Sequence, residues 1–69
     1  MTEPLPTLVE NSLQIAWDFL EASGGIEDPQ QTAEVLLGAI KNLVLRGENR
    51  RLMLSVRAID AFRAFKEAA

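Results

Sequence analysis

Hydrophobic residues recur every three or four positions along three stretches of the chain, which is the spacing of one face of an α-helix. The three stripes are Val9, Leu13, Ala16, Trp17 and Leu20, then Ala33, Leu36, Leu37, Ile40, Leu43 and Val44, and finally Leu54, Ala58, Ala61, Phe62 and Phe65. Glycine and polar residues separate the stretches. The pattern predicts an all-α fold of three helices.

Capping signals set the expected bounds of the first helix. Thr7 and Glu10 have the T-x-x-E spacing of a capping box, in which the hydroxyl and the carboxylate each accept a backbone N–H of the first turn. Gly24 can take the left-handed conformation that closes a helix. We therefore expect a helix over residues 8–22, and a disordered N-terminal lead over residues 1–6.

The second and third helices have comparable signals. Asp28 followed by Pro29 is typical of an N-cap and first helical position, which predicts a helix over residues 29–46 that ends at Gly47. Asn49 is the best N-cap for a third helix over residues 50–67. Because the connections are short, neighbouring helices should be antiparallel, and residues 7–69 should form a single three-helix bundle domain.

Two of the predicted helices have a second apolar face beside the first. These faces comprise Leu8, Ile15 and Phe19 in the first helix, and Leu52, Val56 and Ile59 in the third. A monomeric three-helix bundle needs only one stripe per helix. The excess predicts a homodimer, with Leu52, Val56 and Ile59 as candidate interaction residues. Trp17 is a further candidate, either as an interface anchor or as an ordinary core residue.

A strand over residues 51–57 is the alternative for the start of the third helix, because apolar and polar residues partly alternate there. Leu, Met and Arg favour a helix, and Val56 is the only β-branched residue of the segment. No second strand is predicted to pair with it. The helix is therefore the preferred interpretation.

Composition restricts the chemistry. The 69 residues include no Cys and no His, so disulfides, thiolate chemistry and the common zinc sites are excluded. No Ser or Lys has a spacing that suggests an activated nucleophile. We expect no enzyme, no cofactor and no metal. No hydrophobic run reaches the roughly 18 residues of a membrane span, and the N-terminus lacks a signal-peptide pattern, which predicts a cytoplasmic protein.

Charge is segregated along the chain. Residues 1–40 have a net charge of −7 and residues 41–69 a net charge of +4, with all seven basic residues in the second part. Four arginines are the strongest candidates for a functional cluster: Arg46, Arg50, Arg51 and Arg57. One interpretation pairs them with acidic groups of the first helix or of a second subunit.

Nucleic-acid binding is the alternative interpretation of these arginines. The second helix, Gly47 and the third helix are superficially similar to a helix-turn-helix, with an Arg-rich helix start offered to phosphates. Against this, the second helix is long for that motif, the net charge is −3, and few aromatic residues lie among the arginines.

The segment from Arg46 to Ser55, continuing from Arg57 to Phe62, resembles the C-terminal part of small uncharacterised bacterial proteins of similar length. This resemblance implies a bacterial cytoplasmic origin and brings no activity or binding residue with it. The sequence as a whole predicts a non-catalytic interaction or structural module that acts as a homodimer, or that binds another protein.

Overall fold

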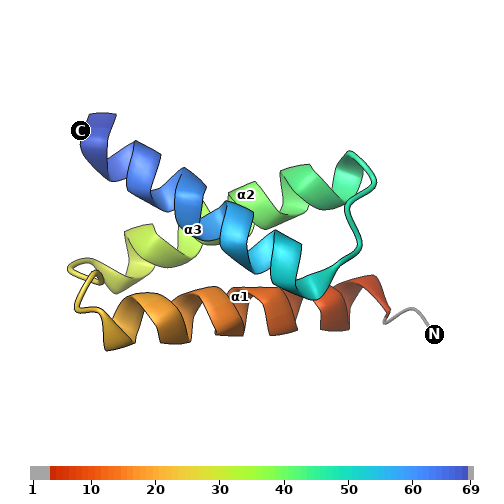
Figure 1. The fold of residues 1–69 in the computed structure, drawn as a ribbon, viewed down its shortest axis with the longest axis horizontal. Coiled ribbons are helices and arrows are strands. Elements are labelled where there is room, and N and C mark those ends of the chain that lie inside the picture. The colour runs from red at the N-terminus through yellow and green to blue at the C-terminus, as the bar shows by residue number, and fades with distance from the viewer. Residues whose placement is uncertain (1–3, 69) are drawn as a thin grey trace.

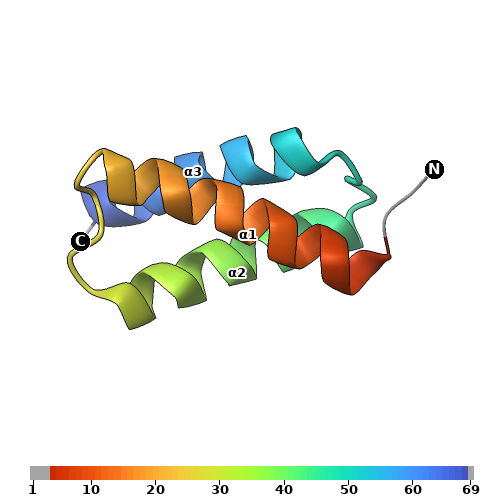
Figure 2. The same cartoon turned by 90° about the horizontal axis from the view of Figure 1, so that it is seen from below.

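The fold consists of three helices in a computed structural model that describes residues 4–68. Helix α1 covers Leu5–Ala22, α2 covers Pro29–Leu45, and α3 covers Arg51–Ala68. Successive helices run in opposite directions along the long axis, and α3 crosses both of the others (Figures 1 and 2). The all-α fold of three packed helices is confirmed, whereas the alternative strand over residues 51–57 is wrong.

Helix α1 begins one turn earlier than the capping box predicts. Pro4 is the N-cap residue, and its carbonyl accepts the backbone N–H of Leu8 at 2.9 Å. Thr7 therefore lies inside the helix rather than at its cap. Pro6 is tolerated because a residue in the first turn needs no hydrogen-bonded N–H. Of the predicted disordered lead, residues 5 and 6 are helical and residues 1–3 lie outside the described part.

Both interhelical turns use glycine as predicted, at φ 74° for Gly24 and φ 99° for Gly47. Each turn closes with the same pair of backbone hydrogen bonds, one spanning five residues and one spanning three. They are Gly25 N–H to the Leu20 carbonyl (2.8 Å), Gly24 N–H to Glu21 (3.1 Å), Glu48 N–H to Leu43 (3.0 Å) and Gly47 N–H to Val44 (3.0 Å). This Schellman arrangement satisfies carbonyls that would otherwise be unpaired at a helix end.

The start of α2 matches the prediction. The Asp28 side chain accepts the backbone N–H of Gln31 at 3.1 Å, which is the expected N-cap bond. Helix α2 ends at Leu45, one residue before the predicted end.

The start of α3 differs from the prediction in its capping group. Asn49 was the expected N-cap, but the side chain that binds the backbone here belongs to Glu48. Its Oε2 atom accepts the backbone N–H groups of Asn49 and Arg50, each at 3.1 Å. The helix itself begins at Arg51.

The core lies where the three helices meet. Its buried apolar residues are Leu8, Ala16 and Leu20 from α1, Leu36 and Ile40 from α2, and Leu54, Ala58, Ile59 and Phe62 from α3. Helix α3 contributes most because its contacts with the other two helices are more extensive than the contact between α1 and α2. Its buried arc therefore extends about 140° from Leu54 to Ile59.

Ile59 corrects one prediction for α3. It is only 8% exposed and belongs to the intramolecular core, not to an exposed second face. Phe65 and Ala61, which the sequence pattern placed in the core stripe, are exposed instead. The buried arc of α3 is thus rotated toward α1 relative to the predicted stripe.

One hydroxyl residue of each helix is also fully buried. These residues are Ser12, Thr32 and Ser55, each at most 1% exposed. Each hydroxyl donates to a backbone carbonyl about one turn earlier in its own chain segment. Ser12 donates to Leu8 (2.7 Å), Thr32 to Asp28 (2.8 Å) and Ser55 to Leu52 (2.8 Å). The hydroxyls are therefore satisfied locally.

Candidate functional site

Several large apolar side chains remain exposed on this small molecule. They are Leu45 (86% exposed), Leu52 (68%), Leu5 (57%), Val56 (50%), Phe19 (48%) and Phe65 (38%). Scattered exposed hydrophobic residues are normal on proteins, whereas neighbouring ones indicate an interaction surface. The positions of these residues relative to one another therefore matter more than their number.

Three of them lie along the boundary between α1 and α3, spread over about three turns of α3. Leu52 and Val56 are one turn apart on α3, so they share a face, and Arg63 lies two turns beyond Val56 on that face. The guanidinium carbon of Arg63 lies 5.5 Å from the centre of the Phe19 ring, which belongs to α1. We call Phe19, Leu52 and Val56 the α1/α3 strip. The strip unites exposed members of the two predicted second faces.

Trp17 lies away from this strip. It is partly buried and packs against the core. Because it is two positions from Phe19, it lies about 200° around α1 from that residue. There it borders a shallow surface hollow with Leu13, Glu10 and Gln14. The structure thus gives Trp17 a packing role, and its role as an interface anchor stays a prediction.

The predicted arginine cluster is brought together only in part. Arg46, Arg50 and Arg57 line one open hollow at the turn between α2 and α3, together with Leu43, Gly47, Glu48 and Asn49. Arg51 is exposed on the first turn of α3 and does not line this hollow. The hollow is basic on balance, because one acidic residue lies among three arginines.

Arg50 forms an ion pair with Glu48 in this hollow. Arg50 donates from Nε to Glu48 Oε2 at 3.1 Å and from Nη2 to Glu48 Oε1 at 3.2 Å. The Glu48 side chain is 16% exposed, while that of Arg50 is 68% exposed. The bidentate pair lowers the pKa of Glu48 and raises the pKa of Arg50, because the side-chain hydrogen bonds, together with the attraction of opposite charges, stabilise both ionised forms. Sequence reasoning missed this pairing, although the i, i+2 spacing in a turn permits it.

Two basic side chains in the C-terminal half of α3 also have intramolecular contacts. Lys66 pairs with Glu27 of the α1–α2 turn at 3.5 Å, and its ammonium lies 5.8 Å from the centre of the Phe62 ring. Arg63 covers Phe19, as described above. Some of the basic side chains are thus paired within the chain, with glutamates of the two turns or with aromatic rings.

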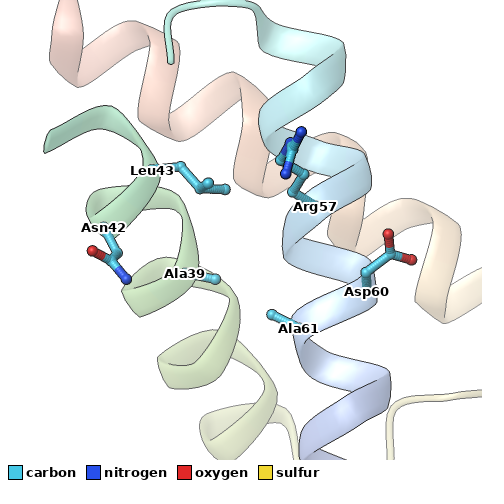
Figure 3. Close-up of a pocket in the computed structure, with 6 residues that line it drawn as sticks. All are labelled: Ala39, Asn42, Leu43, Arg57, Asp60 and Ala61. Carbon is cyan, nitrogen blue, oxygen red and sulfur yellow. The ribbon is translucent and has the colours of Figure 1, made fainter. Parts of the chain in front are cut away.

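A second hollow follows the groove between α2 and α3 (Figure 3). Ala39 and Ala61 face each other across the groove, and Leu43 lies above them, whereas Asp60 points away from α2. The hollow has a volume of about 270 Å³ and is open to solvent. Arg57 and Leu43 also line the arginine hollow, so the two are neighbours. Its walls offer small apolar contacts rather than an arrangement of reacting groups.

The described residues contain no cluster of three or more metal-binding side chains. Within residues 4–68, no helix has both the length and the apolar character needed to cross a membrane.

No family model matches the chain, and no curated protein or solved structure matches it either. The resemblance of residues 46–62 to small bacterial proteins therefore identifies no family.

Proposed function

We propose that this protein is a non-catalytic interaction module that acts as a homodimer. The observation that supports this proposal is the α1/α3 strip, where Phe19, Leu52 and Val56 are each about half exposed or more. Fully burying one such side chain is worth about 1.5–3 kcal/mol relative to leaving it in water. Placing the strip against an apolar surface would therefore contribute several kcal/mol to association.

The size of the domain favours the same conclusion. A core built from about 70 residues supplies only about 3–5 kcal/mol of stability, and small domains are often stabilised further by association. The chain has no cysteine for a disulfide. A second copy that covers the strip would stabilise the fold by mass action.

Sedimentation equilibrium of the wild-type chain tests this function. At tens of micromolar the protein should sediment as a dimer, and dilution should shift it toward monomer. A monomer that persists at about 100 μM would contradict the proposal, because an interface that buries these side chains should be well populated at that concentration.

Nucleic-acid binding is the second candidate, and the observation that favours it is the hollow shared by Arg46, Arg50 and Arg57. Arg50 is already hydrogen-bonded to Glu48, which reduces what it can offer to phosphate. If the arginines bind a duplex, affinity for random DNA at low salt should be measurable and should fall steeply as salt rises.

A matched pair of variants makes this test specific. Arg46→Gln with Arg57→Gln removes two charges from the hollow, whereas Arg63→Gln with Lys66→Gln removes two charges at the other end of α3. Loss of duplex binding in the first pair alone would favour the nucleic-acid function over the interaction module. Equal weak binding by both pairs would indicate nonspecific attraction to the basic half of the chain.

A further inference from the structure

We propose that two copies of this chain dock side by side and antiparallel through the α1/α3 strip, so that the arginine-rich end of each lies beside the acidic end of the other. The inference rests on the proposed homodimer and adds the face, the orientation and the electrostatic reason for it. Three observations carry it: the charges of the two ends, the dimensions of the molecule, and the position of the strip between the ends.

The two ends of the molecule have opposite charges. The α2–α3 turn, at the right of Figure 1, belongs to one end, and its residues 46–51 have a net charge of +2. The α1–α2 turn and the end of α3 lie at the opposite end. Residues 21–28 and 66–67 at that end have a net charge of −3, with the Lys66 to Glu27 pair included. Charge is therefore segregated along the long axis of the fold as well as along the sequence.

The dimensions of the molecule favour docking along its side. A typical specific interface buries about 800 Å² on each partner. The backbone measures 36 × 22 × 17 Å, so an end of the molecule presents a cross-section of 22 × 17 Å, less than half of that area. A long side of 36 × 22 Å presents about that area. End-to-end stacking of opposite charges is therefore too small a contact, and it would also generate open chains instead of a closed dimer.

The strip runs along the length of the molecule and fixes the expected contacts. Helices α1 and α3 run in the same direction, and Leu52 lies in the first turn of α3 while Phe19 lies in the last turn of α1. The two side chains are thus near opposite ends of the strip, with Val56 between them. A two-fold axis perpendicular to the long axis places Leu52 of one copy near Phe19 of the other. The same axis brings each arginine-rich end to an acidic end.

A parallel docking of the same faces would have the opposite consequences. It would place Leu52 next to Leu52 and would bring two arginine-rich ends together, which like-charge repulsion opposes. Identifying the residues that meet across the interface therefore determines the orientation of the two copies.

Cysteine cross-linking measures this directly, because the wild-type chain contains no cysteine. Two single-cysteine variants, Leu52→Cys carrying an affinity tag and Phe19→Cys without one, are mixed under mild oxidation. Proximity raises the effective concentration of thiols that face each other. The mixed disulfide between the two variants should exceed either homodimeric disulfide by about tenfold or more.

Ala64→Cys is the matched control, because Ala64 is exposed on α3 but lies roughly 120° around the helix from Leu52. It should form disulfides only at the background rate with any of the variants. Circular dichroism establishes that each variant remains helical, so that a lost cross-link cannot be attributed to unfolding.

The outcomes separate this inference from the function on which it rests. A wild-type monomer at about 100 μM overturns both. A wild-type dimer in which Leu52→Cys cross-links mainly to itself overturns the antiparallel orientation. A wild-type dimer whose strip variants cross-link no better than Ala64→Cys overturns the choice of face, while the homodimer stands.

Sedimentation equilibrium tests the part played by charge. Replacing Arg46 and Arg51 by glutamine should lower the dimer association constant, because each neutralised end then loses its attraction to the acidic end of the partner. The effect should diminish as salt rises. Stronger association of this variant would overturn the antiparallel orientation, because a parallel dimer would be relieved of repulsion between its arginines.

Discussion

The two faces of α3 differ far more in exposure than in hydrophobicity. Leu54 is completely buried, while Leu52, two positions earlier, is 68% exposed. Ile59 is 8% exposed, while Val56 is 50% exposed. The difference comes from the neighbouring helices, because α3 fills the groove that α1 and α2 offer and only one arc of it fits there. Apolar side chains alone therefore indicate that a face will be buried. Whether a neighbouring helix or another molecule buries it depends on how the helices pack.

The largest expected effect comes from placing a charge on the buried face of α3. Leu54→Asp places a carboxylate at a fully buried position among apolar side chains. The cost of burying an unpaired charge exceeds the roughly 3–5 kcal/mol available to a domain of this size. The variant should be unfolded at 25 °C, and the loss of its helical circular dichroism signal would show this. A cooperatively melting Leu54→Asp variant would contradict the assignment of Leu54 to the core.

The next largest effect comes from placing a charge on the exposed face of α3, which should weaken association and leave the fold intact. Val56→Asp leaves the new charge in water in the monomer, so the variant should keep its helical signal and its cooperative melting transition. In the proposed dimer the charge would be desolvated, so the association constant should fall by at least about tenfold.

Sedimentation of Val56→Asp beside Ala64→Asp sharpens this comparison, because both positions are exposed on α3 and gain the same charge, but only Val56 belongs to the strip. If the two variants associate equally well, the strip is not the interface. If Val56→Asp unfolds, the two faces of α3 cannot be separated as described.

A smaller effect concerns a charged residue on the exposed face. Arg63 covers the ring of Phe19, and cation–π contacts at exposed sites are worth about 0.5–1 kcal/mol. Arg63→Gln should lower the monomer's free energy of unfolding by about that amount in urea titrations. In a Phe19→Leu background the same substitution should have almost no effect, because the ring is then absent. An unchanged cost in that background would mean that Arg63 acts through another contact.

The smallest effect is a pH dependence at the start of α3. The pair with Arg50 lowers the folded-state pKa of Glu48 below its ordinary value of 4.5, so the unfolded chain binds the proton more readily. The stability from this pair is fully present above pH 4.5 and is lost as pH falls below that value toward the lower folded-state pKa. Between pH 6 and 3 the melting temperature of the wild type should therefore decline slightly more than that of Glu48→Gln. Identical declines would show that the pair contributes nothing to stability.

The sequence was a good guide where a local rule has one physical solution. Gly24 and Gly47 adopt positive φ values as helix ends require, and Asp28 caps α2. Thr7 was misleading because the T-x-x-E pattern competes with Pro4 and Pro6, which can equally begin a helix. An earlier start is compatible with the buried line of Leu8 and its partners along α1.

Longer-range packing could not be read from periodicity. Ile59 and Phe65 are both apolar, and the pattern chose Phe65 for the core, but a helix that contacts two neighbours buries a broad arc whose centre depends on where they lie. Ser12 and Ser55 were missed because a hydroxyl counts as polar, although it can satisfy itself on its own helix. Periodicity likewise does not show that Phe19 lies along the same boundary as Leu52 and Val56, because this depends on how α3 crosses α1.

The buried hydroxyls have a consequence for how this sequence can change. Each of Ser12, Thr32 and Ser55 is bonded within its own segment, so none of these hydroxyls acts as a tether between helices. Their value to the core is their small volume, which permits close helix approach. Alanine is the nearest substitute in size, and leucine would overfill the same space. Related sequences should therefore drift freely among serine, threonine and alanine at these three sites, with helix pairing specified by shape and not by polar recognition.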